Sequence, residues 1–290
     1  MTGKICSWAK ICSLKAGTGS VLLFEPDTPE ELQDCLQALG KKLLILGNGT
    51  NLVGSDAPEP MPVLRLGKKG IFGNLSPISD NRFRVGCACN LSQLLRQLAA
   101  LGYGGFSGIS GIPGTLGGAL AMNAGANGQE IGWVVEAIEG VDLRSGHPWL
   151  WCLEQGGWGY RQSPIPQGVI ATQAVLKMQS VDPAAENRLL GAEVQRRRKV
   201  TPTGASAGSV FRNPSAEQPA GRLLEQAGCK GMSEGVFSVS EQHANWIVNL
   251  SRAPGSALDC RKLTQRMQQK VREQFAIDLH CEWRWTEPIF

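Results

Sequence analysis

Apolar residues recur at helical spacing in several stretches of the chain. In the first stretch, positions i, i+3, i+4 and i+7 are apolar, and these are Leu32, Cys35, Leu36 and Leu39. This spacing places them on one face of a helix. Thr28 can cap the start of that helix, with Pro29 in its first turn and Glu31 completing a capping box. We expect Gly40 to end it.

Similar spacing predicts further helices. Asn90 can cap a helix over residues 91–102. The leucines on one face of that helix are Leu91, Leu94, Leu95 and Leu98. A basic helix is expected over 184–200, a short one over 219–228, and a long one over 257–275. The apolar residues of the last helix recur every four positions, at Leu263, Met267, Val271 and Phe275. That recurrence is typical of a face packed against the core.

Short apolar or alternating runs predict β-strands between these helices. They cover residues 21–24, 42–46, 61–66, 82–89, 133–143, 147–153, 168–178, 236–240, 245–250 and 278–285. Helices and strands are mixed without a regular βαβα alternation, so we expect the α+β class. We place a domain boundary near Val181–Pro183, which divides the chain into residues 1–182 and 183–290.

Composition indicates a globular protein that suits an anionic ligand. The 290 residues are enough for one large domain or two ordinary ones, and 42% of them are hydrophobic against 19% charged. The net charge of +4 is mildly basic, which favours an anionic partner without requiring nucleic acid. No apolar run is long enough for a signal peptide or a membrane span, so we expect a cytoplasmic protein without membrane insertion.

The cysteine pattern favours free thiols. The nine cysteines include no CxxC pair, and we expect them to be reduced and mostly buried, with no metal site. Cys87 and Cys89 are two positions apart in a predicted strand, which would place both on one face.

Two glycine-rich turns follow apolar segments, at Leu46–Asn51 and at 111–128. Backbone N–H groups exposed at such turns bind anions. The second turn can begin a short helix just past Pro113, with its first N–H groups free for a phosphate. Two phosphate-binding turns suit a dinucleotide, whereas the alternative is packing turns that bind nothing. The GxGxxG and P-loop patterns are both absent, which argues against a Rossmann site and a P-loop hydrolase.

A series of motifs then carries a family resemblance over about 21–285. They are "LGNGTNLVGSD", "GIPGTLGGALAMNAGANGQEIG", "YRQS", "GSVFRNP", "AGRLLEQAGCKG", "VSEQHANWIVN" and "EWRW", in this order. The chain resembles the UDP-N-acetylenolpyruvoylglucosamine reductases of bacterial cell-wall synthesis. It is similar to the shorter type of this family, which lacks an extra loop that covers the substrate.

The resemblance implies a vanillyl-alcohol-oxidase-type FAD-binding domain of two lobes, followed by a smaller α+β substrate-binding domain. FAD would be the bound cofactor, and NADPH the electron-donating co-substrate. The implied FAD-binding residues are Gly47, Asn48, Gly49, Thr50, Asn51, Leu52, Gly111, Ile112, Pro113, Gly114, Thr115, Gly117, Gly118, Asn123 and Gly125. Glycines there would let the backbone lie against the cofactor without a clash of Cβ atoms.

The resemblance also implies a reaction and its residues. The family reduces the enolpyruvyl ether of UDP-N-acetylglucosamine to a lactyl ether, giving UDP-N-acetylmuramate. Hydride reaches the vinyl carbon β to the carboxylate from the flavin, and the α-carbon then needs a proton. Ser209 matches the proton donor, Arg161 the arginine that grips the carboxylate, and Glu282 a glutamate at the enolic carboxyl. Glu282 is expected on a strand with Trp283 and Trp285 facing the other way.

The residues expected to contact the substrate are Tyr160, Asn213 and His243. Each candidate also has an ordinary structural interpretation, because a turn serine, a surface arginine and a lone histidine are common. Three positions depart from the family pattern: Ser107 replaces a glutamate, and Asn48 and Thr50 stand in the first flavin loop. Thr50 keeps a hydroxyl, and Asn48 tolerates left-handed backbone.

Two alternatives remain beside this interpretation. The chain could be another flavoprotein oxidoreductase that shares only the FAD-binding domain. It could also be a nucleic-acid-binding protein that uses the basic run Arg196–Lys199, although a solvated helix face explains that run better. We expect the enolpyruvyl sugar nucleotide and NADPH as partners, no nucleic acid, and a monomer.

Overall fold

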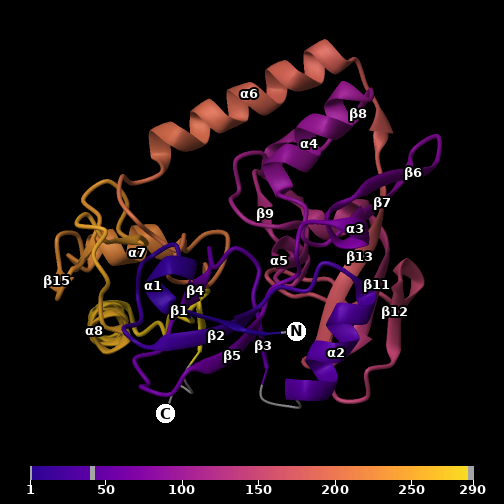
Figure 1. Cartoon of the computed structure of the whole chain (residues 1–290). Helices are drawn as coiled ribbons and strands as arrows, with labels where there is room; N and C mark the ends of the chain where they lie inside the picture. The colour runs from indigo at the N-terminus through magenta and orange to yellow at the C-terminus, as the bar shows by residue number, and fades with distance from the viewer. Residues whose placement is uncertain (1, 40–42, 287–290) are drawn as a thin grey trace. The chain divides into compact units, whose positions relative to one another are not determined.

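The structure is a computed structural model that describes residues 2–39 and 43–286 (Figure 1). These residues form two compact units, each discontinuous in sequence. The first unit takes in the described residues of 1–3, 23–48 and 62–198, and the second those of 4–22, 49–61 and 199–290. The division between residues 182 and 183 that the sequence suggested stays a prediction.

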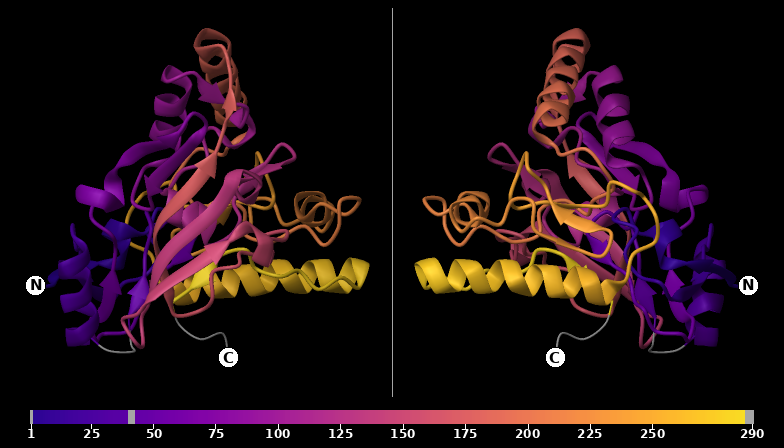
Figure 2. Two further views of the ribbon diagram at one scale, coloured as in Figure 1. Left: turned by 90° about the vertical axis from the view of Figure 1, so that its right-hand side faces the viewer. Right: turned by 90° about the vertical axis from the view of Figure 1, so that its left-hand side faces the viewer.

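A five-stranded antiparallel sheet forms the centre of the first unit (Figure 2). Its strand order is β12-β11-β13-β7-β6. The bounds are β6 (Leu75–Ser79), β7 (Arg82–Gly86), β11 (Val135–Asp142), β12 (Pro148–Cys152) and β13 (Val169–Lys177). The middle strand β13 is buried along most of its length, which explains its nearly continuous run of apolar residues.

The first unit also contains helices and short strands outside this sheet. The helices are α2 (Pro29–Leu39), α3 (Gly70–Gly73), α4 (Leu91–Ala100), α5 (Leu116–Leu120) and α6 (Pro183–Val200), the last of which ends in the second unit. The 3₁₀ helices are Ser107–Ile109, Ile131–Val134 and Leu153–Gln155. The short strands are β3 (Leu44–Ile45), β5 (Met61–Leu64), β8 (Tyr103–Gly104), β9 (Gly125–Ala126), β10 (Gln129–Glu130) and β14 (Gln179–Ser180). They pair as β3 with β5 in parallel, and as β9 with β10 and β8 with β14 antiparallel.

The second unit is built around one long helix. Its elements are β1 (Lys4–Ser7), α1 (Trp8–Ile11), the first residues of β2 (Ser20–Phe24), β4 (Leu52–Val53), α7 (Ala220–Gln226), β15 (Ser233–Glu234), β16 (Phe237–Val239), β17 (Ile247–Val248), α8 (Ala257–Phe275) and β18 (Arg284–Trp285). Strands β15-β16-β17 form an antiparallel sheet, and β18 pairs with β4 in parallel. Figure 2 shows α8 as one straight helix, drawn in yellow. Its predicted core face is confirmed, because Leu263, Met267 and Val271 are fully buried and Phe275 packs partly buried beside them.

The predicted helix starts are confirmed, with one shift. The Thr28 hydroxyl accepts a hydrogen bond from the Glu31 N–H at 3.2 Å, as an N-cap does. The Glu31 carboxylate accepts from the Asp27 N–H at 2.7 Å and not from that of Thr28, so the capping box closes one residue earlier. Asn90 caps α4 through the Gln93 N–H at 3.0 Å. Gly40 lies outside the described residues.

Three strand predictions need correction. Lys42 of the strand expected at 42–46 lies outside the described residues. Over 43–46 the strand is only β3, and Ile45 in it is 36% exposed, so it is not a buried strand. Strand β7 ends at Gly86, and the Cys89 N–H turns back to the Gly86 carbonyl at 3.1 Å, so Cys87 and Cys89 share no strand face. The strand expected at 278–285 is reduced to β18, because the backbone hydrogen bonds of this segment go to two separate segments of the chain.

The nine cysteines all lie within the described residues and none of them forms a disulfide there. Five are buried and four half-buried, and burial raises the pKa of Cys87. The described residues contain no group of three or more His, Cys, Asp or Glu that could hold a metal ion. Within the same residues, no helix has both the length and the apolar character that crossing a membrane requires.

Asp56 ties two distant segments of the second unit together. Its carboxylate accepts hydrogen bonds from the N–H and hydroxyl of Thr18, both at 2.9 Å. It also accepts from the Ser256 hydroxyl at 2.7 Å and from the N–H groups of Ala257 and Leu258 at the start of α8. Burial raises the pKa of Asp56, but the hydrogen bonds from Ser256, Ala257, Thr18 and Leu258 outweigh it and hold the pKa well below its usual range.

We therefore expect Asp56→Ala to lower the free energy of unfolding by about 2 kcal/mol at pH 7, because charged hydrogen bonds at a helix start are lost. The carboxylate form makes these bonds. Its contribution is complete above the pKa of an unfolded aspartate, about 3.9, and is lost as the pH falls toward the lower folded pKa. Urea titrations at pH 7 and below pH 4 measure both effects, with the exposed Asp80→Ala as control. The role of Asp56 would be contradicted if the difference in the free energy of unfolding between parent and variant were as large below pH 4 as at pH 7.

Candidate active site

The two glycine-rich turns meet within the first unit. A Cβ added at Gly47 would lie 3.1 Å from the Thr115 hydroxyl oxygen and 3.6 Å from the Gly118 Cα. Thr115 caps α5 and accepts from the Gly118 N–H at 3.2 Å, which fixes its side chain beside Gly47. The part of the first turn at Gly47 therefore lies beside the second turn, whereas Gly49, Thr50, Asn51 and Leu52 belong to the second unit.

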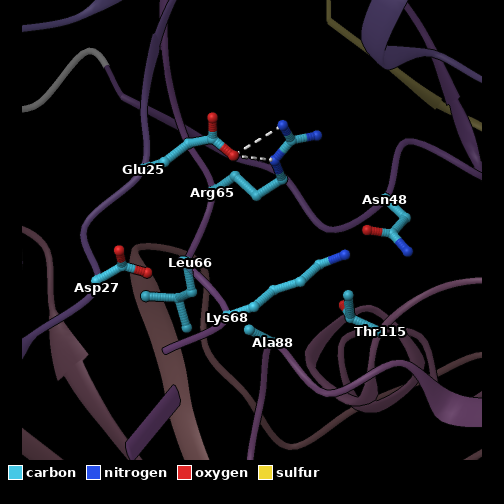
Figure 3. A pocket seen from close by; sticks show the side chains of 9 residues that line it. Glu25, Asp27, Asn48, Arg65, Leu66, Lys68, Ala88 and Thr115 are labelled. Carbon is cyan, nitrogen blue, oxygen red and sulfur yellow. Dashed lines mark hydrogen bonds and ion pairs between the residues drawn. The ribbon is translucent and has the colours of Figure 1, made fainter. Parts of the chain in front are cut away.

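A cavity of about 360 Å³ opens where these turns meet (Figure 3). Asn48 and Thr115 line it together with residues that the sequence analysis missed, which are Glu25, Asp27, Arg65 and Lys68. Figure 3 shows the Lys68 side chain extending toward Asn48 and Thr115. Arg65 is held instead by Glu25, whose carboxylate accepts from its Nε and Nη2 at 3.0 and 2.8 Å. The lysines of "LGKKG", directly after a predicted strand, were the signal that could have indicated the cationic part of this wall.

The chemistry of this wall fits part of a dinucleotide. An ammonium, an amide and a hydroxyl beside small residues are donors that bind a diphosphate. The Glu25 and Asp27 carboxylates are acceptors, which suits the hydroxyl groups of a ribose. At Gly118 an added Cβ would meet only the Thr115 hydroxyl, at 3.4 Å, so the surface there is otherwise open.

The expectation of free N–H groups at the start of α5 is wrong. The Leu116 N–H donates to the Cys89 carbonyl at 2.9 Å, and the Gly117 N–H to the Cys87 carbonyl at 2.8 Å. The Gly118 N–H donates to Thr115. Backbone carbonyls of the turn that follows β7 therefore accept the first N–H groups of α5. No N–H of the first turn of α5 is left for a phosphate.

Protein neighbours leave little or no room for a side chain at several glycines of the predicted loops. At Gly49, where φ is +63°, a Cβ would lie 1.9 Å from the Ile11 carbonyl oxygen. At Gly117 it would lie 3.1 Å from Cys87, and at Gly111 it would lie 3.1 Å from the Arg197 side chain. Packing within the protein thus explains these bare positions, and contact of Gly111, Ile112, Pro113, Gly114 and the other predicted residues with FAD stays a prediction.

Arg161 occupies a tight turn of the first unit. The Gly159 and Gln162 backbones exchange two hydrogen bonds, at 3.1 and 2.9 Å, so Tyr160 and Arg161 are the central residues of a two-residue turn. Arg161 has φ +55°, which is uncommon for a residue with a side chain. Its guanidinium lies 5.1 Å from the Tyr160 ring centre and donates to the Gly125 carbonyl at 3.3 Å. Tyr160 is 51% exposed.

The basic run of α6 divides into two environments. Arg196 is exposed and paired with Glu193 at 2.8 Å, as a solvated helix face predicts. Arg197 does not follow that prediction, because its side chain packs against Gly111. Burial lowers the pKa of Arg197, the charge of Glu193 opposes this effect, and the charges of Arg196 and Arg161 lower the pKa further. A second guanidinium near Arg161 makes this region attractive to an anion.

Ser209 and Glu282 lie on neighbouring backbone segments of the second unit. Ser209 forms an isolated bridge with Trp246, and the next residue, Val210, accepts from the Glu282 N–H at 2.8 Å. The Glu282 carbonyl in turn accepts from the Asn51 side chain at 3.0 Å. Glu282 precedes β18, so the expectation that it lies on a strand is wrong. The Trp283 and Trp285 rings lie 6.5 Å apart.

Asn213 and His243 have structural contacts in the same unit. The Asn213 side chain accepts from the Ala220 N–H at 3.0 Å at the start of α7. The His243 Nδ1 accepts from the Asn245 N–H at 3.2 Å, and burial lowers the pKa of this histidine. The ring also lies against Gly221, where a Cβ would be 2.8 Å from its Cε1. Contact of either residue with the substrate stays a prediction.

Known proteins match almost the whole chain. Two family models match, the FAD binding domain over residues 21–146 and the UDP-N-acetylenolpyruvoylglucosamine reductase C-terminal domain over residues 200–286. The reductase of Myxococcus xanthus is 35% identical over 94% of this chain and 88% of its own. The reductase of Thermus thermophilus is 37% identical over 91% of this chain and 92% of its own. The chain belongs to the UDP-N-acetylenolpyruvoylglucosamine reductase family.

A solved structure of this family is similar over its full length. The reductase from Thermus caldophilus has a TM-score of 0.82 and 34% identity, covering 98% of this chain and 99% of its own. The predicted fold class is confirmed, with an FAD-binding domain followed by a smaller C-terminal domain. The chain is thus a flavin-dependent oxidoreductase with FAD as cofactor and NADPH as reductant. The C-terminal match argues against a flavoprotein that shares only the FAD domain.

Proposed function

We propose that this protein reduces UDP-N-acetylglucosamine enolpyruvate to UDP-N-acetylmuramate, a step in the synthesis of peptidoglycan precursors. The observation that carries the proposal is that the family's C-terminal domain spans residues 200–286, which include Ser209 and Glu282. Bound FAD would take a hydride from NADPH and supply it to the vinyl carbon β to the substrate carboxylate. The remaining chemistry falls to residues of the chain itself.

Three residues would divide that chemistry. The Ser209 hydroxyl would donate a proton to the α-carbon, so that the double bond gains one hydride and one proton. A serine is a weak acid in water, so it serves only where the carbon that accepts its proton is strongly basic. The Arg161 guanidinium would bind the carboxylate, whose oxygens gain negative charge as hydride arrives. Glu282 would hold a hydrogen bond to the same carboxyl.

Charge in the first unit supports an anionic substrate and cofactor. Arg161 and Arg197 are close enough for the charge of Arg161 to lower the pKa of Arg197, and an anion placed near both would relieve their repulsion. Lys68, Asn48 and Thr115 on the cavity wall would hold the FAD diphosphate. Tyr160, Asn213 and His243 are proposed substrate contacts. A monomeric state and a cytoplasmic location are proposed on composition alone.

The test follows the colour of the purified protein. We expect a yellow protein that NADPH bleaches under anaerobic conditions, and whose colour the enolpyruvyl sugar nucleotide restores. The product should be heavier than the substrate by two hydrogen atoms in mass spectrometry. UDP-N-acetylglucosamine, which lacks the enolpyruvyl group, is the control and should leave the protein bleached. A bleached protein that the enolpyruvyl nucleotide did not recolour would refute the proposed substrate.

A further inference from the structure

The Tyr160–Arg161 turn holds its arginine in a backbone conformation that glycine would normally occupy. The turn is closed by hydrogen bonds in both directions between Gly159 and Gln162. Tyr160 has no positive φ, whereas Arg161 does, as in a type II turn. An arginine at that position is strained, and strain of this kind persists only where surrounding contacts fix the backbone.

Asn123 supplies the contact that fixes this turn. Its side chain is completely buried, with 0% exposure. Its Nδ2 donates to the Gly159 carbonyl at 2.9 Å and to the Glu130 carboxylate at 2.7 Å, while its Oδ1 accepts from the Gly132 N–H at 3.1 Å. The amide thus uses both hydrogens and its oxygen within the protein. The Gly159 carbonyl receives a bond from Asn123 in addition to the one that closes the turn.

A second contact comes from the hairpin that follows Asn123 and holds the Arg161 guanidinium. Arg161 Nη2 donates to the carbonyl of Gly125, which is two residues after Asn123. Gly125 pairs with Glu130 between β9 and β10, so the partner of Asn123 also stabilises the residue that accepts from Arg161. Trp158, just before the turn, packs on Gly132, where a Cβ would lie 2.6 Å from its ring. The hairpin that follows Asn123 therefore supports the backbone and the side chain of the arginine.

We propose that Asn123 is a positioning residue that fixes the Tyr160–Arg161 turn so that the Arg161 guanidinium meets the substrate carboxylate. This inference rests on the proposed function of Arg161. Only a carboxamide provides two donors and one acceptor at this reach, and asparagine tolerates the φ of +45° found here. The presence of Asn123 in the glycine-rich segment is explained by this buried amide.

The test compares two asparagines of one segment. Asn123→Gly removes the amide and accepts the positive φ without strain. Asn127→Gly is the matched control, because Asn127 has φ +52° and its side chain bonds Gly108, Glu193 and Arg196, none of which belongs to the Tyr160–Arg161 turn. Stopped-flow absorbance separates reduction of the flavin by NADPH from its reoxidation by the enolpyruvyl nucleotide. We expect Asn123→Gly to slow reoxidation about 30-fold and reduction less than about 2-fold, with the control unchanged in both.

A double variant distinguishes this inference from the proposal on which it rests. If Asn123 acts through Arg161, Asn123→Gly should cause no further loss of reoxidation in an Arg161→Gly background. A large loss in Arg161→Gly together with parental rates in Asn123→Gly would overturn the inference alone. Parental reoxidation in Arg161→Gly would overturn the role of Arg161 itself.

A second single variant keeps the inference testable if Asn123→Gly does not fold. Glu130→Ala removes the acceptor that orients the Asn123 amide but leaves the bond to Gly159 possible. We expect reoxidation to fall about 5-fold with reduction unchanged. Equal losses in both half-reactions, or loss of bound flavin from a folded variant, would show that the contact supports the whole unit and would overturn the inference.

Discussion

Replacing Ser209 by alanine is expected to slow reoxidation of the flavin by the enolpyruvyl nucleotide by a factor on the order of 10⁴, with reduction by NADPH unchanged. Hydride transfer from NADPH does not need the hydroxyl, because no proton reaches the substrate in that step. Under the proposed role of Ser209, reoxidation needs it, because the α-carbon must be protonated as the double bond is reduced. Alanine would then leave that proton to be supplied by solvent.

The surroundings of Ser209 indicate that the variant will fold. Its backbone is held by the bridge to Trp246, and the Val210 N–H donates to the Asn245 carbonyl at 2.9 Å. Ser206→Ala is a suitable control, because this serine is also half-buried and precedes Ser209 by three residues. Rapid-mixing absorbance of both half-reactions measures the effect. Parental reoxidation in Ser209→Ala would remove Ser209 from the role of proton donor.

Local patterns predicted the helices well because each signal lies in one short segment. Thr28 and Asn90 cap their helices through N–H groups three residues ahead, an interaction that needs no distant partner. The apolar period of α8 likewise identified its buried face. Strand ends were less predictable, because they depend on partners far away in sequence. The Cys87 N–H still donates to the Thr172 carbonyl of β13, whereas the Cys89 N–H turns back to Gly86, which the cysteine spacing could not reveal.

The candidate site shows the same limit. Glycine-rich turns indicated a candidate cofactor region, but the charged wall with Lys68 comes from a separate segment that carries no recognised motif. The left-handed backbone of Arg161 and the burial of Asn123 depend on contacts with residues far along the chain. The roles of Ser209 and Glu282 came from a family resemblance, because neither residue type in isolation distinguishes a catalytic group from a structural one.

Replacing Arg161 by glycine is expected to separate function from stability. Reoxidation by the enolpyruvyl nucleotide should fall on the order of 10³-fold, because the carboxylate loses the guanidinium that stabilises its developing charge. The free energy of unfolding should stay within about 1 kcal/mol of the parent. Glycine relieves the left-handed strain at φ +55° but orders a more flexible residue, and the two effects are of similar size.

Arg252→Gly is the matched control, because Arg252 is an exposed arginine with nearly the same backbone, at φ +56°. It should show the same small change in urea unfolding and parental rates in both half-reactions. A loss of reoxidation in Arg161→Gly alone would then arise from the guanidinium and not from the turn. Two results would contradict this role: an equal loss of reoxidation in both glycine variants, or a parental rate in Arg161→Gly. The carboxylate would then have to be bound by another cation, and the nearby Arg197 would be the first candidate.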